Sequence, residues 1–398
     1  MTVKDLVSRV LFKVNPYWDE IPWNRERDKY LKSSGVNPRR SKGINKFMAR
    51  PVHVVVVPQH GPGDLRYAPA KWNIYFEAEK SLIEFLGASH VSVFGVAEDE
   101  SQSFWIPRLL EHIQETQATH ILTHIETDPG NQVENWNWDI VFEKLLSSGW
   151  DGVLLGVNFD SAYKWIRAKS RRLARSSPQF MAVDICMPLD GQFVQDRSEV
   201  GPVNMPISRE TVGIVDQALS NIEKKFDVSF IGALYPYRVE LIDELRARGI
   251  DVAVNPHRAD ETVDLATSRA NQPTWLEYMQ GLASSHMTIN FSRSSAGPFE
   301  QLKTRVIEAG LAGTYLLTDD KDRTRLFFPP DEFSTFDSVD DLPDLIESLL
   351  RDRADLDVRA RRAQVRAREL AVTDFWEGID QGLQIRGLPT IIPLKIPL

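Results

Sequence analysis

Two acidic residues, Glu300 and Glu308, stand eight positions apart with a hydroxyl side chain, Thr304, halfway between them. On a helix over residues 299–309, these three side chains would fall within about 80° of one another and form one polar stripe. The helix would begin at residues 297–298, a Gly-Pro pair, where free backbone N–H groups attract anions. The spacing therefore predicts a polar face beside a phosphate-binding helix end.

Two cations, Lys303 and Arg305, flank the central hydroxyl of this stripe. A helical wheel separates them by about 160°, so only one of the two can point toward a ligand. A plain surface helix explains the same residues, because each glutamate would form an ion pair with the cation three positions away. The helical pattern by itself leaves both interpretations open.

A glycine-containing loop follows the predicted strand at residues 52–57 and carries His60 and Asp64. Its glycines, Gly61 and Gly63, allow the backbone to come close to a ligand. We therefore expect His60 or Asp64 to contact a bound ligand.

His124 lies near the end of another predicted strand, at residues 119–125. Alternation along the strand places His120 and His124 on one face, so a buried, hydrogen-bonded histidine is the alternative to a ligand contact. Glu126 and Asp160 also stand at strand ends, and we rank both below His124.

The elements that could position these residues are strands and helices that alternate from residue 51 to residue 186. Short β-branched runs alternate there with helical patterns, which is typical of βα units around a parallel sheet. The predicted strands cover residues 52–57, 90–94, 119–125, 153–157 and 181–185, and the predicted helices cover residues 72–85, 103–115, 138–147 and 161–174.

This alternation stops between residues 187 and 212, where prolines and glycines interrupt the chain, and strands and helices alternate again after residue 212. In such sheets, ligands bind at the carboxyl ends of the strands, so a large ligand could lie between the two halves. We expect four parts: a basic extension at 1–50, domains at 51–205 and 206–370, and a C-terminal helix and tail at 371–398.

The second set of strands is predicted at residues 228–233, 252–255, 287–291 and 315–318. Its helices are predicted at residues 238–248, 274–284, 299–309, 340–352 and 351–370.

The composition is that of a folded protein, with 398 residues, 42% hydrophobic and 26% charged side chains. A single cysteine, Cys186, excludes an internal disulfide and a cysteine-based zinc site, which favours a reducing compartment. No signal peptide and no run of about 20 apolar residues is visible. We therefore expect a cytoplasmic protein.

The net charge of −9 argues against bulk nucleic-acid binding, but residues 1–50 carry twelve Lys or Arg against five Asp or Glu, a net charge of +7. Residues 3–14 read as an amphipathic helix, which either packs on the protein body or touches the inner face of an anionic membrane. A second basic run, at residues 164–175, is either a solvated helix face or a site for an anionic acceptor.

An acidic run at Asp319–Asp322 resembles a metal-binding motif, but it follows a predicted strand in a polar stretch, and we assign it to a loop. The chain contains no Gly-x4-Gly-Lys-Ser/Thr, His-Glu-x2-His or Gly-x-Ser-x-Gly motif. These absences exclude the common ATPase, zinc protease and serine hydrolase classes.

The Glu-x7-Glu pattern of Glu300 and Glu308 is followed by Ala-Gly-Leu-Ala-Gly and by a strand over residues 315–318. This order resembles glycosyltransferases of the GT-B fold. Residues 326–333 and 336–342 look like the C-terminal domain of the spore-maturation-type, group 1-like glycosyltransferases. The resemblance is specific over residues 228–350.

For the architecture, the resemblance implies two Rossmann-like α/β domains that face each other across a cleft, with a C-terminal helix that crosses back to the first domain. For the donor site, it implies that Glu308 binds the donor ribose and that Glu300 faces the donor sugar. Lys303 or Arg305, with Thr304 beside them, would help to bind the diphosphate.

The same resemblance implies that Gly232 lets the backbone approach the donor and that Arg238 contacts a phosphate. An ordinary βα turn with a surface arginine is the alternative at these two positions. We list His124, His60 and Asp64 with Glu300 as catalytic candidates.

The implied reaction is sugar transfer from a nucleotide-diphospho-sugar to an unidentified glycan or other hydroxyl-bearing acceptor, with no metal and no cofactor required. The Glu-x7-Glu pattern favours retention of configuration; in an inverting enzyme, His60, Asp64 or Glu126 would be the base. Two alternatives use the same fold: a sugar-nucleotide epimerase or hydrolase, and a catalytically silent module that binds a glycan or a protein.

Overall fold

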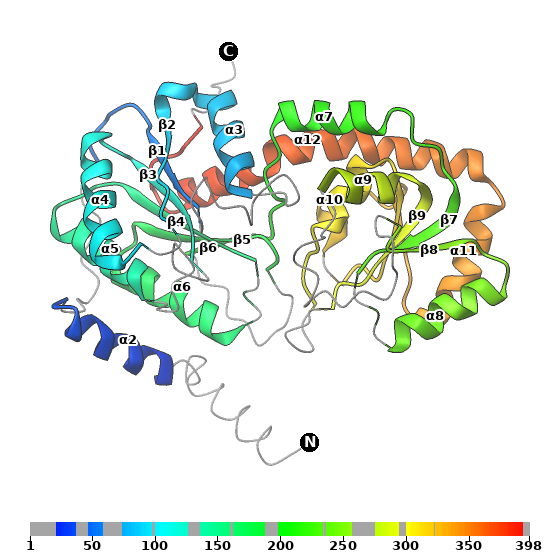
Figure 1. The fold of residues 1–398 in the computed structure, drawn as a ribbon, viewed down its shortest axis with the longest axis horizontal. Helices are drawn as coiled ribbons and strands as arrows, with labels where there is room; N and C mark the ends of the chain where they lie inside the picture. The colour runs from blue at the N-terminus through cyan, green and yellow to red at the C-terminus, as the bar shows by residue number, and fades with distance from the viewer. Residues whose placement is uncertain are drawn as a thin grey trace.

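The structure is a computed structural model of the 398-residue chain (Figure 1). Two parallel sheets with helices on their faces lie side by side, and one long helix runs along both (Figure 1). The residues that the structure describes are 21–36, 47–58, 74–97, 100–125, 136–159, 161, 163–187, 198–232, 234, 236–256, 275–293, 300–321 and 323–392.

The first sheet has six parallel strands in the order β2-β1-β3-β4-β5-β6. Its inner strands are buried on both faces, as is usual in parallel sheets, and most of their residues are apolar. The strands are β1 (Val54–Val57), β2 (Val91–Val93), β3 (His120–His124), β4 (Val153–Asn158), β5 (Phe180–Asp184) and β6 (Glu199–Val200), and the helices between them are α3 (Ile74–Leu86), α4 (Gln102–Glu115), α5 (Asn137–Ser147) and α6 (Lys164–Ser176), with a short 3-10 turn η3 (Ala88–His90).

Alternate residues of these strands face two separate cores. Val54 and Leu122 pack on the side covered by α3, whereas Val55 and Ile121 pack on the side covered by α4 and α5. His120 and His124 have the same parity as Leu122, so the structure places them on the α3 side of the sheet.

Helix α2 (Ile21–Ser33) belongs to the predicted basic extension, yet it is anchored to the first sheet's helices. Arg27 Nε donates to the fully buried Asp139 carboxylate at 2.7 Å, and Arg27 Nη2 donates to the Ser176 hydroxyl at 3.3 Å. Removing one member of such a buried pair leaves an uncompensated charge, so this contact fixes α2 firmly.

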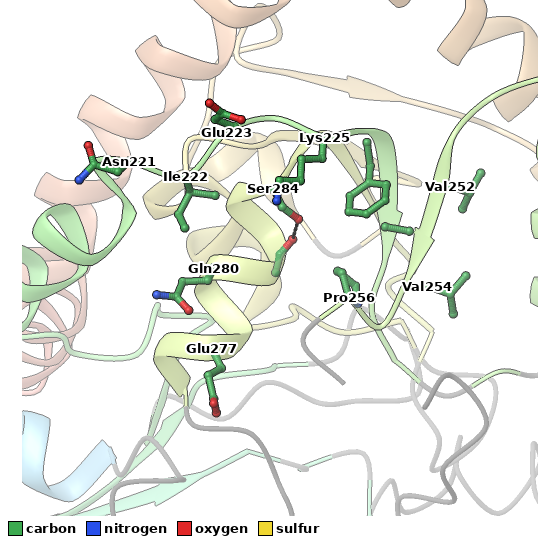
Figure 2. A pocket seen from close by; sticks show the side chains of 13 residues that line it. Asn221, Ile222, Glu223, Lys225, Val252, Val254, Pro256, Glu277, Gln280 and Ser284 are labelled. Carbon is green, nitrogen blue, oxygen red and sulfur yellow. Dashed lines mark hydrogen bonds between the residues drawn. The ribbon is translucent and has the colours of Figure 1, made fainter. Parts of the chain in front are cut away.

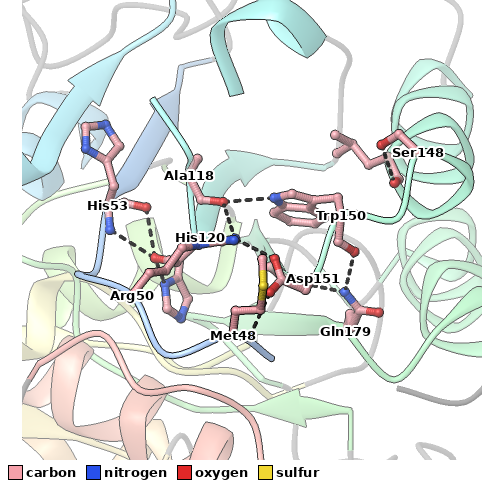
Figure 3. A network of polar contacts seen from close by, with 12 residues as sticks. Met48, Arg50, His53, Ala118, His120, Ser148, Trp150, Asp151 and Gln179 are labelled. Carbon is pink, nitrogen blue, oxygen red and sulfur yellow. Dashed lines mark hydrogen bonds and ion pairs between the residues drawn. The ribbon is translucent and has the colours of Figure 1, made fainter. Parts of the chain in front are cut away.

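A polar network closes the amino ends of the same strands, at the edge opposite the predicted ligand site (Figure 3). Asp151 accepts the Met48 N–H at 2.9 Å and pairs with Arg50 at 2.6 Å, while the Trp150 indole donates to the Ala118 carbonyl at 2.8 Å. His120 lies in this network and bonds the Pro389 carbonyl through Nε2 at 3.0 Å, which ties the end of the chain to the first sheet.

The second sheet has five parallel strands in the order β11-β10-β9-β7-β8. Helices α7, α9 and α10 cover one face, and α8 and α11 cover the other (Figure 1). The strands are β7 (Phe226–Phe230), β8 (Val252–Val254), β9 (Ser285–Asn290), β10 (Tyr315–Thr318) and β11 (Phe333–Thr335), and the helical elements are α7 (Arg209–Leu219), α8 (Pro236–Ala247), α9 (Trp275–Ala283), α10 (Arg305–Leu311), η6 (Thr324–Leu326), η7 (Val339–Asp341) and α11 (Leu342–Leu350).

Helix α12 (Arg353–Ile385) has 33 residues and contributes to both units (Figure 1). Its small residues, including Ala367, pack in the second core, where a Cβ added at Gly310 would come 2.6 Å from Ala367 Cβ. Further along, Phe375 and Trp376 pack in the first core. The predicted return of a C-terminal helix to the first domain is therefore confirmed.

Several predicted elements differ from the structure. The charged segment at 351–370 and the aromatic segment after it form one helix rather than two parts. Helix α7 and strands β6 and β11 were not predicted. No helix among the residues described above is long and apolar enough to cross a membrane.

Candidate functional site

The carboxyl ends of the second sheet's strands form a polar edge. The Asp319 carboxylate, after β10, accepts the Ser292 N–H at 3.3 Å, and Ser292 follows β9. The Asn255 side-chain oxygen, after β8, accepts the Gly232 N–H at 2.9 Å, and Gly232 follows β7. Hydrogen bonds thus join the end of β9 to the end of β10, and the end of β7 to the end of β8.

Glu300 lies at this edge, but it is not helical. It pairs with Arg293 in an isolated antiparallel bridge, and the next N–H, that of Gln301, donates to the Ser292 carbonyl at 3.0 Å. The Glu300 carboxylate accepts the Ser292 hydroxyl at 2.6 Å. The predicted helix over 299–309 is therefore wrong in its first half, because the returning chain pairs with residues that leave β9.

Glu308 lies inside α10 and is almost fully buried. Oε1 accepts the Trp275 indole N–H at 3.0 Å, and Oε2 accepts the hydroxyls of Tyr278 at 2.9 Å and Thr304 at 3.3 Å. Burial raises the pKa of Glu308, while these three hydrogen bonds and the charge of Arg305 oppose that rise. The single stripe predicted for both glutamates does not exist, since only Thr304 and Glu308 make contact.

Arg305 is the cation that turns toward the sheet edge. A Cβ added at Gly232 would lie 3.5 Å from Arg305 Nη2, so the guanidinium lies beside the backbone that leaves β7. Gly232 has φ of 140°, a conformation that side-chain-bearing residues rarely adopt. Lys303 precedes the helix and is half-buried. The structure thus brings together Gly232 and Arg305 from the predicted donor-binding set.

Arg238 lies in the first turn of α8 and is buried, with 9% of its surface exposed. Its guanidinium carbon lies 5.0 Å from the centre of the Phe291 ring and 5.4 Å from that of Phe230. Its Nε donates to the Tyr237 hydroxyl at 2.9 Å. This arginine is therefore embedded among aromatic rings rather than exposed at a plain surface turn.

On the first domain, His124 is the last residue of β3 and is buried against Phe159, with ring centres 5.9 Å apart in an edge-to-face arrangement. It lies at the carboxyl end of its strand, as predicted from the sequence. His60, Asp64, Glu126, Asp160 and residues 3–14 lie outside the described residues.

The basic run at 164–175 forms most of α6, and it is not the solvated face that such runs usually make. Lys169, Arg171 and Arg172 are buried, with exposed fractions of 0%, 4% and 3%. The Arg172 guanidinium lies 4.0 Å from the centre of the Trp136 ring. Burial of this kind was not visible from the spacing, which contains no acidic residue to suggest it.

A cavity of about 860 Å³ lies between α9 and the edge strand β8 (Figure 2). Glu277 and Gln280 line it from α9, and Pro256 lines it near the carboxyl edge of the sheet. Sequence reasoning did not identify this cavity, because the contributing segments lie far apart along the chain.

Asp319 binds both its own loop and the segment that follows β9, and Asp320 binds within the loop. Asp319 accepts backbone N–H groups, and Asp320 forms an ion pair with Arg325. Across the described ranges, no three His, Cys, Asp or Glu side chains are grouped so that they could hold a metal ion. The hydrogen bonds and the ion pair of these two aspartates hold the loop after β10 in place.

Residues 238–373 match a protein family described as glycosyl transferase-like. The second domain is glycosyl transferase-like. The two Rossmann-like sheets and the returning helix α12, together with this match, identify the GT-B fold that we expected from the sequence resemblance. No curated protein matches the sequence.

Among solved structures, this chain is similar to Anabaena HepE in complex with UDP-glucose, at 12% identity and a TM-score of 0.47, over 83% of this chain and 99% of that one. Sucrose-phosphate synthase from Thermosynechococcus elongatus is similar at 13% identity and a TM-score of 0.44, over 84% of this chain and 97% of that one. T4 phage BGT in complex with its UDP-glucose substrate is similar at 9% identity and a TM-score of 0.44, over 83% of this chain and 99% of that one. Likeness at this level identifies no ligand for the present chain.

Proposed function

We propose that the chain is a glycosyltransferase that binds a nucleotide-diphospho-sugar at the carboxyl edge of its second sheet and transfers the sugar to a hydroxyl-bearing acceptor. The observation that carries this proposal is the placement of Arg305 against Gly232, next to the edge that holds Glu300. A cation, an approachable backbone and a carboxylate thus meet within a domain that is glycosyl transferase-like.

The leaving nucleoside diphosphate gains negative charge as the bond to the sugar breaks, and a positioned cation stabilises that charge. Arg305 can supply it, because its Nη2 lies beside the backbone that leaves β7 at the sheet edge. Since this charge comes from the protein, we propose a transfer that does not require a metal. The Glu-x7-Glu pattern supports retention of configuration.

Glu300 is the residue that we place against the donor sugar. Its carboxylate is bound on one side by the Ser292 hydroxyl and is half-buried, which leaves a surface for sugar hydroxyls. The acceptor would approach from the first domain, where His124 ends β3 and where we place His60 and Asp64.

Thermal-shift measurements with UDP, GDP, ADP, CMP and dTDP sugars test this proposal. A ligand at 100 times its Kd adds about 2.7 kcal/mol to the stability of the folded state, so one donor class should raise the Tm clearly. Arg305→Ala should reduce that shift, whereas Arg248→Ala, an exposed arginine of the same domain, should leave it unchanged.

If no nucleotide raises the Tm at millimolar concentration, the donor-site proposal is wrong. Incubation of the selected donor without acceptor then separates the related enzymes. Release of free sugar would identify a hydrolase, and an isomerised donor would identify an epimerase.

A further inference from the structure

A continuous set of hydrogen bonds joins helix α9 to the start of α10. Glu308 accepts the Trp275 indole N–H on one oxygen and the Tyr278 hydroxyl on the other, at 3.0 and 2.9 Å. The Tyr278 side chain also lies close enough to Arg305 for the two groups to interact electrostatically. Because Arg305 lies beside Gly232, the set runs from the interior of the domain to the sheet edge.

The direction of these hydrogen bonds follows from the chemistry of the phenol. A tyrosine hydroxyl has one hydrogen, and an arginine can only donate. The Tyr278 hydroxyl donates its hydrogen to the Glu308 carboxylate, so the phenol oxygen is left to accept an N–H of Arg305. Burial and the nearby Glu308 charge raise the pKa of Tyr278, so this hydrogen is retained at neutral pH.

Glu308 itself is buried, with 6% of its surface exposed, and already accepts three protein donors. A carboxylate offers about four acceptor positions, so most of its capacity is used inside the protein. Its effect on a bound donor would therefore be carried by its neighbours. The neighbour that reaches the sheet edge is Arg305, through Tyr278.

Resting on the proposed function, we propose that Tyr278 and Glu308 are positioning residues that hold the Arg305 guanidinium against Gly232, ready for the diphosphate of the donor. Glu308 orients the Tyr278 hydroxyl, and the oxygen of that hydroxyl then holds one N–H of Arg305. An arginine side chain loses considerable rotamer freedom when it is fixed, and this arrangement fixes it before the ligand arrives.

A double-mutant cycle with Tyr278→Phe and Arg305→Ala tests this role, with calorimetric titration of UDP, GDP and ADP into the full-length protein. Tyr278→Phe keeps the ring and removes only the hydroxyl. We expect it to weaken binding of the nucleoside diphosphate about five-fold, the effect of one hydrogen bond. In the Arg305→Ala background, the same change should have no further effect.

Tyr315→Phe is the matched control, because it removes another buried tyrosine hydroxyl, bonded to Ser334 at 3.0 Å, at the amino end of β10. We expect it to leave diphosphate affinity unchanged. An equal loss from Tyr278→Phe in both Arg305 backgrounds would show that Tyr278 acts through general packing and would overturn the inference.

If Tyr278→Phe does not fold, Glu308→Gln takes its place in the same cycle and should weaken binding only when Arg305 is present. Failure of the wild-type protein to bind UDP, GDP or ADP would contradict the proposed function itself. Wild-type binding with no loss in Tyr278→Phe would contradict only the positioning role.

Discussion

The Ser292 hydroxyl donates a hydrogen bond of 2.6 Å to the carboxylate of Glu300. Ser292 is the second residue after β9, the central strand of the five-stranded sheet. The position of Glu300 is thus set by the sheet and by the paired chain beside it, and not by a helix. A carboxylate held in this way can face a ligand at the carboxyl edge with little freedom to move.

Glu300→Gln should reduce the rate of sugar transfer by about 100-fold, because it removes a charge where we expect charge to develop in the transition state. The amide oxygen can still accept the Ser292 hydroxyl, so the loop should keep its shape. Nucleoside diphosphate affinity should change less than two-fold, since Arg305 is untouched. Measurement of kcat and of Kd separates the two effects, and a wild-type kcat would contradict the role assigned to Glu300.

Gly232→Ala should weaken donor binding and destabilise the protein by about 1–3 kcal/mol, because alanine is strained at the φ of 140° found there. Gly213→Ala, within α7, is the control: a Cβ there meets nothing within 4 Å, and alanine favours a helix. Urea denaturation and nucleotide titration of both variants give the comparison. Equal stability for the two would show that the backbone at Gly232 is not constrained.

Arg238→Ala should lower the free energy of unfolding by about 2–3 kcal/mol, because it leaves a space among three aromatic rings. Arg248→Ala, just after the same helix, removes an exposed arginine with surface ion pairs and should shift the urea midpoint little. If Arg238→Ala weakens nucleotide binding without a loss of stability, its role is that of the phosphate contact implied by the family resemblance.

Asp380 should make the protein less stable as the pH rises from about 4 to about 6. Its carboxylate accepts the N–H groups of Ile391 and Ile392, and burial raises its pKa to about 6. Below pH 4 it is protonated in both states, whereas between pH 4 and 6 only the unfolded state has lost the proton. The folded state is therefore favoured at the acidic end by on the order of 2 kcal/mol.

Urea midpoints at pH 4.5 and pH 7 check this dependence. Asp380→Asn cannot ionise, so the difference between the two midpoints should change in the variant. An unchanged difference would show that Asp380 titrates with its ordinary pKa in the folded protein.

Local sequence patterns were sufficient for most of the two sheets. The run Val54–Val57 is apolar on both faces, and such a run bounded by turn residues predicts a buried parallel strand. Helix α7 had a readable start as well, since Ser208 caps it and accepts the Thr211 N–H. The prolines that precede this cap favour a loop and conceal the helix start in the sequence.

The remaining features depend on contacts between distant segments. Glu300 leaves the predicted helix because the backbone returns to pair with Arg293, and no helical wheel contains that information. Arg27 anchors α2 through Asp139, 112 positions away. The choice of Arg305 over Lys303 as the cation near Gly232 likewise follows from where α10 begins.

The path of α12 has a consequence for the order in which the molecule can be completed. The strands of the first sheet have all been synthesised once residue 200 is added. Phe375, Trp376 and Ile379, which help to cover one face of that sheet, are synthesised only after the whole second sheet. During synthesis, the part of this apolar face that α12 covers therefore stays exposed until the end of the chain is made. The first domain is synthesised first, but its core is completed only when α12 has been made.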